Sequence, residues 1–292
     1  MLVQQMTVVV REAKPSDKKP LMDFVTKTWG GHDYVPSVWD EWLRDKGGKM
    51  FVVEVDGKQV GMNRVRLLKD GTGWLEGVRI HPDFRGKGLA SLLGEKSMQY
   101  ASKLGVSTFR LTSSSRNRAA HRQVSKMGFS EVARFDVFRA RTKSRLLHRG
   151  GVDRLSPADL SKALRVIRGS DEYRAGMGVY WDAFVTRALD RAALSDLIAK
   201  GYVFSAGDEK GNTALAICGP AKEGEEVWLQ MSFLCGDPAL CKKIVSHLFR
   251  GSRPRRDENF VFLPKGSRLS KSLKEVGLKK YFQMVVFEGR LD

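Results

Sequence analysis

The sequence predicts an α/β protein with a mixed, mostly antiparallel sheet flanked by helices. Across residues 1–140, apolar strand-like stretches alternate with segments of helical periodicity. The dipeptide Asp56-Gly57 favours a tight hairpin turn, and such turns join antiparallel neighbours. A strand at 74–80 runs into a basic glycine loop and then a helix, which is typical of an α/β unit.

The elements of the first half follow from their start and stop signals. Pro15 and Pro36 suit first helical turns, Asn117 can cap a helix, and Gly105 and Gly128 can end one. We expect strands over 7–12, 50–55, 59–68, 74–80, 107–112 and 132–140, and helices over 15–28, 36–44, 87–104 and 117–127.

The second half repeats this order faintly. We expect strands over 152–155, 202–206, 213–218, 227–234, 259–263 and 282–288, and helices starting at 156 and over 180–189, 191–200, 238–249 and 270–276. Strand–helix–strand after Val227 echoes strand–helix–strand after Trp74, which suggests an internal duplication. The loop at Asp237 lacks the arginine and second glycine, so we expect no phosphate binding there.

A basic run marks the expected boundary. It holds Arg139, Arg141, Lys143, Arg145 and Arg149 and ends at Gly150-Gly151. We therefore divide the chain into a domain at 1–140, a linker at 141–151 and a domain at 152–292. A solvated connector is the simpler interpretation of the run, and a phosphate or nucleic-acid contact is the alternative.

Composition narrows the class of protein. The chain has 292 residues, of which 42% are hydrophobic, enough to build real cores. Its three cysteines fit neither a disulfide framework nor a zinc site. We see no signal peptide and no apolar stretch long enough for a bilayer, so we expect a cytoplasmic protein. The net charge of +18 suits a polyanionic ligand, nucleic acid, or solubility alone.

The loop Arg85-Gly86-Lys87-Gly88-Leu89-Ala90 is the strongest local signal. Glycine amides can point at a phosphate, and the following helix adds its dipole. Arg85 and Lys87 add positive charge. The loop therefore predicts a site for a diphosphate-containing cofactor, although an ordinary strand-to-helix turn would have a similar sequence.

This loop resembles the Arg/Gln-x-x-Gly-x-Gly/Ala signature of the GNAT superfamily of acetyl-CoA-dependent N-acetyltransferases. Residues 117–129 resemble the next helix and strand entry of the family, and residues 9–17 its first strand and helix cap. The resemblance covers about residues 6 to 140. The segment 32–36, with Trp39, Trp42 and a long second domain, is similar to the two-domain branch that includes histidine N-acetyltransferases.

The resemblance implies a GNAT-like sheet, a degenerate GNAT-like second domain, and acetyl-CoA as co-substrate without a metal. The pantetheine arm would follow the strand, the diphosphate the loop, and Asn117 would add a contact or serve only as a helix cap. The expected acetyl-CoA contacts are Val78, Arg79, Ile80, Arg85, Gly86, Lys87, Gly88, Leu89, Ala90 and Asn117.

Glu76 is the candidate catalytic base. Strand alternation would place it on the same face as Val78, near the thioester. The alternative is an ion pair with a nearby arginine, and Glu12 and Asp33 are the next carboxylates to consider. Val124 occupies the position where such families usually have a tyrosine as the thiolate acid.

Either Ser125, His121 or water could replace that tyrosine. For the amine acceptor we expect Asp33, Tyr34 and Trp39, although Trp39 also fits a core-facing helix stripe.

Three functions remain open on the sequence alone. The first is acetyl transfer to a primary amine, which could be a free amino acid such as histidine, another small metabolite or a protein N-terminus. The second is an inactive acyl-CoA sensor, and the third a basic nucleic-acid-associated protein. We expect no membrane partner, and either a monomer or a homodimer.

Overall fold

The computed structural model describes residues 6–141, 151–249 and 258–291. Its contacts group into two units. Within the described residues, unit 1 holds 6–111, 117–130 and 287–291, and unit 2 holds 112–116 and 131–286. This grouping is not sequential like the expected domains, because the strand after residue 130 packs in unit 2 and the chain's end returns to unit 1. The expected basic linker lies mostly outside the described residues.

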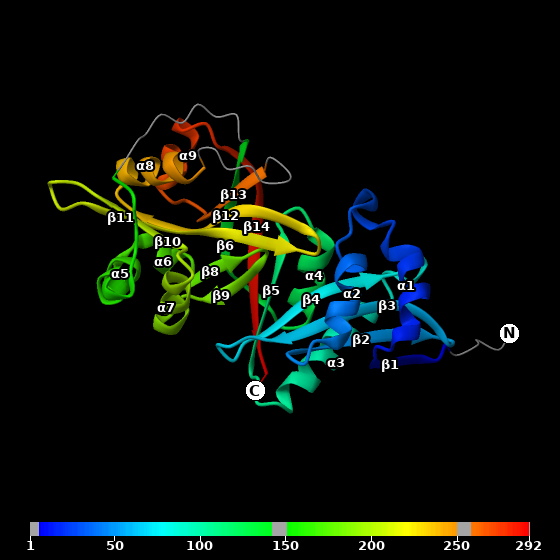
Figure 1. Cartoon of the computed structure of the whole chain (residues 1–292). Coiled ribbons are helices and arrows are strands. Elements are labelled where there is room, and N and C mark those ends of the chain that lie inside the picture. Colours follow the sequence, from blue (N-terminus) through cyan, green and yellow to red (C-terminus); the bar gives the residue numbers. More distant parts are fainter. Residues whose placement is uncertain (1–5, 142–150, 250–257, 292) are drawn as a thin grey trace. The chain divides into compact units, whose positions relative to one another are not determined.

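Unit 1 contains a sheet in the order β1-β2-β3-β4-β5 (Figure 1). The first four strands are antiparallel and β5 is parallel to β4. The bounds are β1 Val8–Glu12, β2 Gly48–Val55, β3 Lys58–Leu67, β4 Gly73–Ile80 and β5 Thr108–Ser114. Asp56 and Gly57 both have positive φ, as a type I′ turn requires, so the expected hairpin is confirmed.

The helices of unit 1 cover both faces of its sheet. They are η1 Pro15–Asp17, α1 Lys18–Val25, η2 Thr28–Gly31, α2 Val35–Arg44, η3 Pro82–Phe84, α3 Leu89–Ser102 and α4 Arg118–Lys126. Met62 of β3 packs into the cluster under α1 and α2, whereas its neighbour Asn63 bonds to α3. Since successive strand residues point to opposite faces, α3 lies across the sheet from α1 and α2.

Unit 2 has strands in the order β14-β6-β13-β12-β11-β10-β7, with β12 and β13 parallel. The strands are β6 Ser130–Arg141, β7 Asp153–Arg154, β8 Val179–Asp182, β9 Val185–Ala188, β10 Val203–Gly207, β11 Thr213–Glu223, β12 Glu226–Gly236, β13 Glu258–Pro264 and β14 Lys279–Arg290. The helices are η4 Pro157–Asp159, α5 Leu160–Gly169, α6 Asp171–Ala175, α7 Arg191–Ala199, α8 Pro238–Leu248 and α9 Leu269–Glu275.

The helix expected over 180–189 is wrong. The chain forms the antiparallel hairpin β8–β9 there, with Trp181 opposite Thr186. The turn contains Ala183 at a φ of 50°, a conformation that usually requires glycine or asparagine. Because alanine stands there instead, this turn has no signal in the sequence. Trp181 is buried and stacks on Phe262, so the hairpin contributes to the core.

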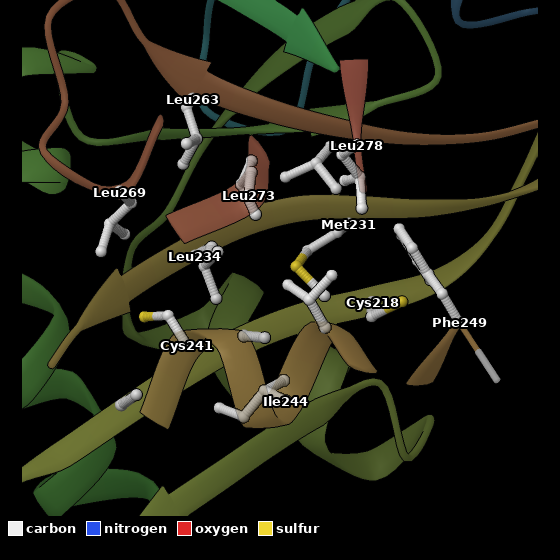
Figure 2. Close-up of a cluster of buried hydrophobic side chains, with 14 of the residues drawn as sticks. Cys218, Met231, Leu234, Cys241, Ile244, Phe249, Leu263, Leu269, Leu273 and Leu278 are labelled. Atoms are coloured by element: carbon white, nitrogen blue, oxygen red, sulfur yellow. The ribbon is translucent and has the colours of Figure 1, made fainter. Parts of the chain in front are cut away.

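One hydrophobic cluster of unit 2 lies between its sheet and the helices α8 and α9, and another contains residues of α5 and α7. Figure 2 shows Ile244 of α8, Leu273 of α9, Cys218 and Met231 as members of one cluster of buried hydrophobic side chains. Here an antiparallel hairpin (β11–β12) is followed by a helix (α8) and a parallel strand (β13). The same order, β3–β4, α3 and β5, occurs in unit 1, which is the repeat that the sequence suggested.

Candidate functional site

A cavity of about 920 Å³ opens in unit 1 beside the end of β4. Its walls come from the end of α1 and the residues after it, the end of β4, the loop after β4, the first turn of α3, and α4 along its length. The lining residues are Phe24, Lys27, Thr28, Val78, Arg79, Ile80, Pro82, Phe84, Arg85, Gly86, Gly88, Leu89, Ala90, Ser91, Asn117, Ala119, Ala120, Arg122, Gln123 and Lys126.

The strands β4 and β5 separate on the way to this cavity. Their recorded pairing is limited to Gly73 with Phe109 and Trp74 with Arg110. In the described part of the chain, the rest of β4 has no partner in β5, while its other edge stays paired with β3. The β4 edge facing the gap therefore has backbone groups available to a ligand.

A β-bulge interrupts β4 where it meets the cavity. Arg64 pairs with Glu76 and Met62 with Arg79, so Gly77 and Val78 together oppose the single residue Asn63. Gly77 has a φ of 70°, and a Cβ there would lie 2.6 Å from the Trp42 ring. The bulge breaks the alternation that would put Glu76 and Val78 on one face. Val78 lines the cavity and Glu76 does not.

The loop after β4 ends at the first turn of α3 with its amides exposed. Gly86 and Gly88 both have a φ of 78°, and Gly88 is the N-cap of α3. The first recorded main-chain bonds of this turn come from Ser91 and Leu92 to the Gly88 carbonyl. Among the described residues, the amides from 86 to 90 donate no backbone bond. Such a cluster of free donors at a helix start can bind an anion.

Positive charge surrounds this loop. The cationic residues of the cavity wall are Lys27, Arg79, Arg85, Arg122 and Lys126, and no carboxylate is among the described lining residues. Arg85 donates from Nε to the Ile80 carbonyl at 3.2 Å. Lys87 does not line the cavity, and its Nζ lies over the Phe84 ring at 4.9 Å.

Asn117 fulfils the helix-cap role and also reaches the cavity. Its Oδ1 accepts from the Ala120 amide at 3.2 Å, and the residue lines the wall contributed by α4. The two roles considered for it are compatible in this structure.

The expected acceptor residues form a buried group beside the cavity. Arg79 binds Asp33 through two bonds, at 2.5 Å from Nε and 2.9 Å from Nη2. Thr28 and the Val35 amide also donate to Asp33. Tyr34 lies under the Arg79 guanidinium at 5.5 Å. Trp39 is fully buried in the core under α1 and α2, as the alternative interpretation held.

Charges balance inside this group. Burial would raise the pKa of Asp33, but the hydrogen bonds and charge of Arg79, with the Thr28 bond, hold that pKa below its usual range. Burial would likewise lower the pKa of Arg79, and Asp33 and Tyr34 raise it instead. Asp33 is therefore an ionised carboxylate already occupied by a guanidinium.

Glu76 is also engaged. Arg64 donates to it at 2.9 Å, and Arg66 lies 3.6 Å away. Arg64 also pairs with Asp45 and stacks on Trp42. Burial, with Arg66 nearby, lowers the pKa of Arg64 despite these partners. The ion-pair alternative is thus present in the structure, with Arg64 as the main partner.

The candidate replacements for the missing tyrosine do not reach the cavity. Val124 is buried, and His121 packs edge-on against Phe287 at a ring distance of 4.9 Å. Ser125 is exposed and is not part of the wall, whereas Gln123 is.

Several site features escaped the sequence analysis. Phe24 of α1 lines the cavity together with Lys27 and Thr28, which follow that helix, and no local pattern marked these residues. The bulge had one signal, a glycine inside a predicted strand, which favours a bulge or a close approach. Asn63, a polar residue in an apolar strand, was also overlooked.

Comparisons with known proteins agree with this geometry. The sequence model of the Acetyltransferase (GNAT) family matches residues 19–129. Histidine N-acetyltransferase of Oreochromis niloticus is 33% identical over 82 residues, which cover 28% of this chain and 24% of that protein. An uncharacterized N-acetyltransferase of Methanocaldococcus jannaschii is 29% identical over 140 residues, covering 43% of this chain and 62% of its own. The chain thus spans less than two thirds of either relative.

A solved GCN5-related N-acetyltransferase from Sphaerobacter thermophilus covers 97% of this chain and 95% of its own, with a TM-score of 0.61 and 14% identity. That likeness concerns the fold. Among the described residues, no helix combines the length and apolar character needed to cross a bilayer, and no cluster of three metal-ligating side chains occurs. The cavity wall and the loop lie within residues 19–129, so the segment that matches the acetyltransferase (GNAT) family model is the one that contains the candidate site.

Proposed function

We propose that unit 1 binds acetyl-CoA and transfers its acetyl group to a primary amine. One observation carries the proposal: the free loop amides and the unpaired edge of β4 border the same cavity. In acetyl-CoA the diphosphate is followed by the pantetheine arm and then by the thioester. The loop amides suit the diphosphate, and the edge of β4 suits the arm that leads to the thioester. The surrounding cations suit a polyanionic co-substrate.

The residues that would hold acetyl-CoA are those of the loop and of β4. The amides from Gly86 to Ala90 would receive the diphosphate, and the edge at Val78, Arg79 and Ile80 the amides of the arm. Acetyl-CoA supplies an activated acyl group as a thioester. The bulge at Gly77 and Val78 offers a main-chain donor, which can stabilise the negative charge that develops on the acyl oxygen.

The transfer forms an N–C bond and breaks the C–S bond. The amine nitrogen must lose a proton, and the sulfur leaves as a thiolate. A thiolate is an adequate leaving group because the pKa of a thiol is about 8.5. We retain Glu76 as the proton acceptor. Since it lies outside the cavity wall, the proton would reach it through water.

The acceptor site is assigned to the side of the cavity next to Asp33 and Tyr34. Asp33 could hold an ammonium group only by sharing its oxygens with Arg79. Trp39 supports this wall from the core rather than touching the acceptor. The histidine N-acetyltransferase relatives make free histidine the first acceptor to test.

Unit 2 is proposed to be a degenerate copy that binds no CoA. Asp237 accepts from the Ala239 and Leu240 amides at 2.8 and 3.1 Å, so it occupies the donors that a phosphate would need. Pro238 has no amide hydrogen to offer.

A melting experiment and a transfer assay test the proposal. Acetyl-CoA should raise the melting temperature by mass action, and thiol release should depend on an added amine from a panel of histidine, spermidine and an unblocked alanyl peptide. The three cysteines are buried, and burial raises the pKa of Cys235 to about 12, so the native protein should give little thiol background. An unchanged melting temperature would remove the co-substrate assignment.

A matched pair of variants sharpens the test. Gly88→Val should abolish the acetyl-CoA shift, because it strains the loop and shields its amides. Gly105→Val is the control, since Gly105 ends the same helix with a similar positive φ and equally open surroundings. A shift after CoA addition without amine-dependent turnover would favour the acyl-CoA sensor, and steeply salt-dependent RNA binding without a shift would favour the nucleic-acid protein.

A further inference from the structure

Asn63 is a buried polar residue that the proposed chemistry does not use. It lies in the middle of β3 and is 1% exposed. Its Nδ2 donates to the Leu93 carbonyl at 3.1 Å and to Ser97 Oγ at 2.8 Å, both in α3. Because a carbonyl can only accept, the bond to Leu93 fixes which way the amide faces.

The same residue marks the bulge. Asn63 is the single β3 residue opposite Gly77 and Val78 of β4. One side chain therefore links the strand at the bulge to the helix whose first turn carries the free amides. These are the two places that would hold opposite ends of the acetyl-pantetheine-diphosphate chain.

Stability alone gives no reason for an amide at this position. Asn63 Oδ1 is buried and has no hydrogen-bond partner among the residues that the structure describes, and such an orphan acceptor costs about 1–3 kcal/mol. Unit 2 shows that apolar contacts suffice for the same arrangement. There Ile244 of α8 belongs to the same cluster of buried hydrophobic residues as Cys218 of β11 and Met231 of β12 (Figure 2).

We propose that Asn63 is a positioning residue for acetyl transfer. It holds α3 in fixed register with the bulge of β4, so that the thioester meets the bulge while the diphosphate rests on the loop. The inference rests on the proposed function. A flexible pantetheine arm can still bind when this register loosens, but the acyl carbon is then misplaced, and small misplacements cost rate steeply.

The test compares Asn63→Leu with a matched control. Gln230→Leu removes another buried amide, which donates to the Trp181 and Ala183 carbonyls within unit 2. The CoA affinity of each variant is measured by calorimetry. Its kcat and KM are measured with acetyl-CoA and with the amine of the panel that the unaltered protein acetylates fastest. We expect Asn63→Leu to lower kcat about tenfold or more, with CoA affinity changed less than about threefold. Gln230→Leu should change neither, whatever its melting temperature.

Equal kcat in Asn63→Leu and the unaltered protein would overturn the inference, as would an equal loss in Gln230→Leu. If Asn63→Leu does not fold, Ser97→Ala replaces it. That variant removes one of the two bonds, and a kcat unchanged by it overturns the inference too. If the unaltered protein neither binds acetyl-CoA nor acetylates an amine, the proposed function fails together with the inference. If the unaltered protein is active and Asn63→Leu is equally active, only the inference fails.

Discussion

In unit 1, residues 81–88 join β4 to α3 through two glycines at positive φ, and the amides at the start of α3 have no main-chain partner in the part of the chain that the structure describes. In unit 2, β12 enters α8 through Asp237, whose carboxylate caps the helix. Both arrangements satisfy the geometry of a strand-to-helix turn. The difference teaches that the fold alone does not make an anion site. A helix start binds phosphate only when the chain leaves its donors free.

The strands before these loops differ in the cross-strand pair that stands next to a register shift. Both β4 and β12 carry a register shift against the preceding strand. The cross-strand pair just before the shift is Glu76 with Arg64 in unit 1 and Met231 with Cys218 in unit 2. Unit 2 thus has a register shift at the corresponding place, with buried apolar side chains where unit 1 has a charged pair.

The largest expected effect comes from giving unit 1 the cap of unit 2. Gly88→Asp places a carboxylate at the N-cap of α3, where it can take the free amides and repel a diphosphate. We expect CoA affinity to fall on the order of 1,000-fold, since at least two charge-assisted hydrogen bonds are lost. Calorimetric titration with CoA measures it.

Gly88→Asn is the control for that variant. Asparagine tolerates the left-handed conformation as aspartate does and carries no charge. Its loss should be clearly smaller, and the gap between the two variants isolates the charge. Unaltered CoA binding in Gly88→Asp would contradict the contrast drawn between the two loops.

The sequence alone predicts those features of the two loops that depend on the residues within them. Glycines, a capping aspartate and an Asp-Gly hairpin each constrain the backbone within a few residues. Asp33 and Arg79 could not be paired from the sequence, because a contact between residues so far apart depends on how η2 and α2 meet β4. Trp39 was ambiguous for a related reason. An aromatic stripe on a helix can face the core or a ligand, and packing decides which.

The second prediction contrasts the buried carboxylates of the two units. Asp33 is held by the Arg79 guanidinium, whereas Glu172 in unit 2 accepts from the Ser267 hydroxyl at 2.9 Å. Asp33→Asn leaves a buried cation without its partner, so we expect a loss of about 3 kcal/mol in the free energy of unfolding. Glu172→Gln leaves no unpaired charge and should cost less. Urea unfolding of both variants measures the difference.

The loss in Asp33→Asn should depend on pH with a definite sign. The pKa of Asp33 is lower in the folded chain than the value of about 3.9 expected for an unfolded one. The ion pair therefore stabilises fully above that value, and its contribution disappears as pH falls through the folded pKa. The stability gap between the unaltered protein and Asp33→Asn should be constant near neutral pH and shrink in acid. A gap that grew in acid would refute the pairing.

The third prediction concerns the charged pair of Glu76 and Arg64, in whose place unit 2 has Met231 and Cys218. Glu76→Gln should lower kcat about tenfold or more by removing the proton acceptor, with little change in KM for acetyl-CoA. Asp45→Asn is the matched control, because it removes the other carboxylate of Arg64 and leaves Glu76 in place. Equal losses in the two variants would show that Glu76 acts by holding Arg64, and unchanged turnover in Glu76→Gln would remove it from the mechanism.

The smallest effect concerns the cations of the two units. Lys242 of α8 donates to Glu275 at 2.8 Å, whereas Lys126 of α4 lines the cavity and has no ion-pair partner among the described residues. Lys126→Gln should raise KM for acetyl-CoA about threefold at low salt and weaken the salt dependence of kcat/KM, since one exposed charge steers a polyanion only modestly. Lys103→Gln removes an exposed charge of unit 1 outside the cavity wall, so its kinetics should match those of the unaltered protein. If both variants changed KM equally, the general basicity of the chain, and not the cavity, would be attracting the co-substrate.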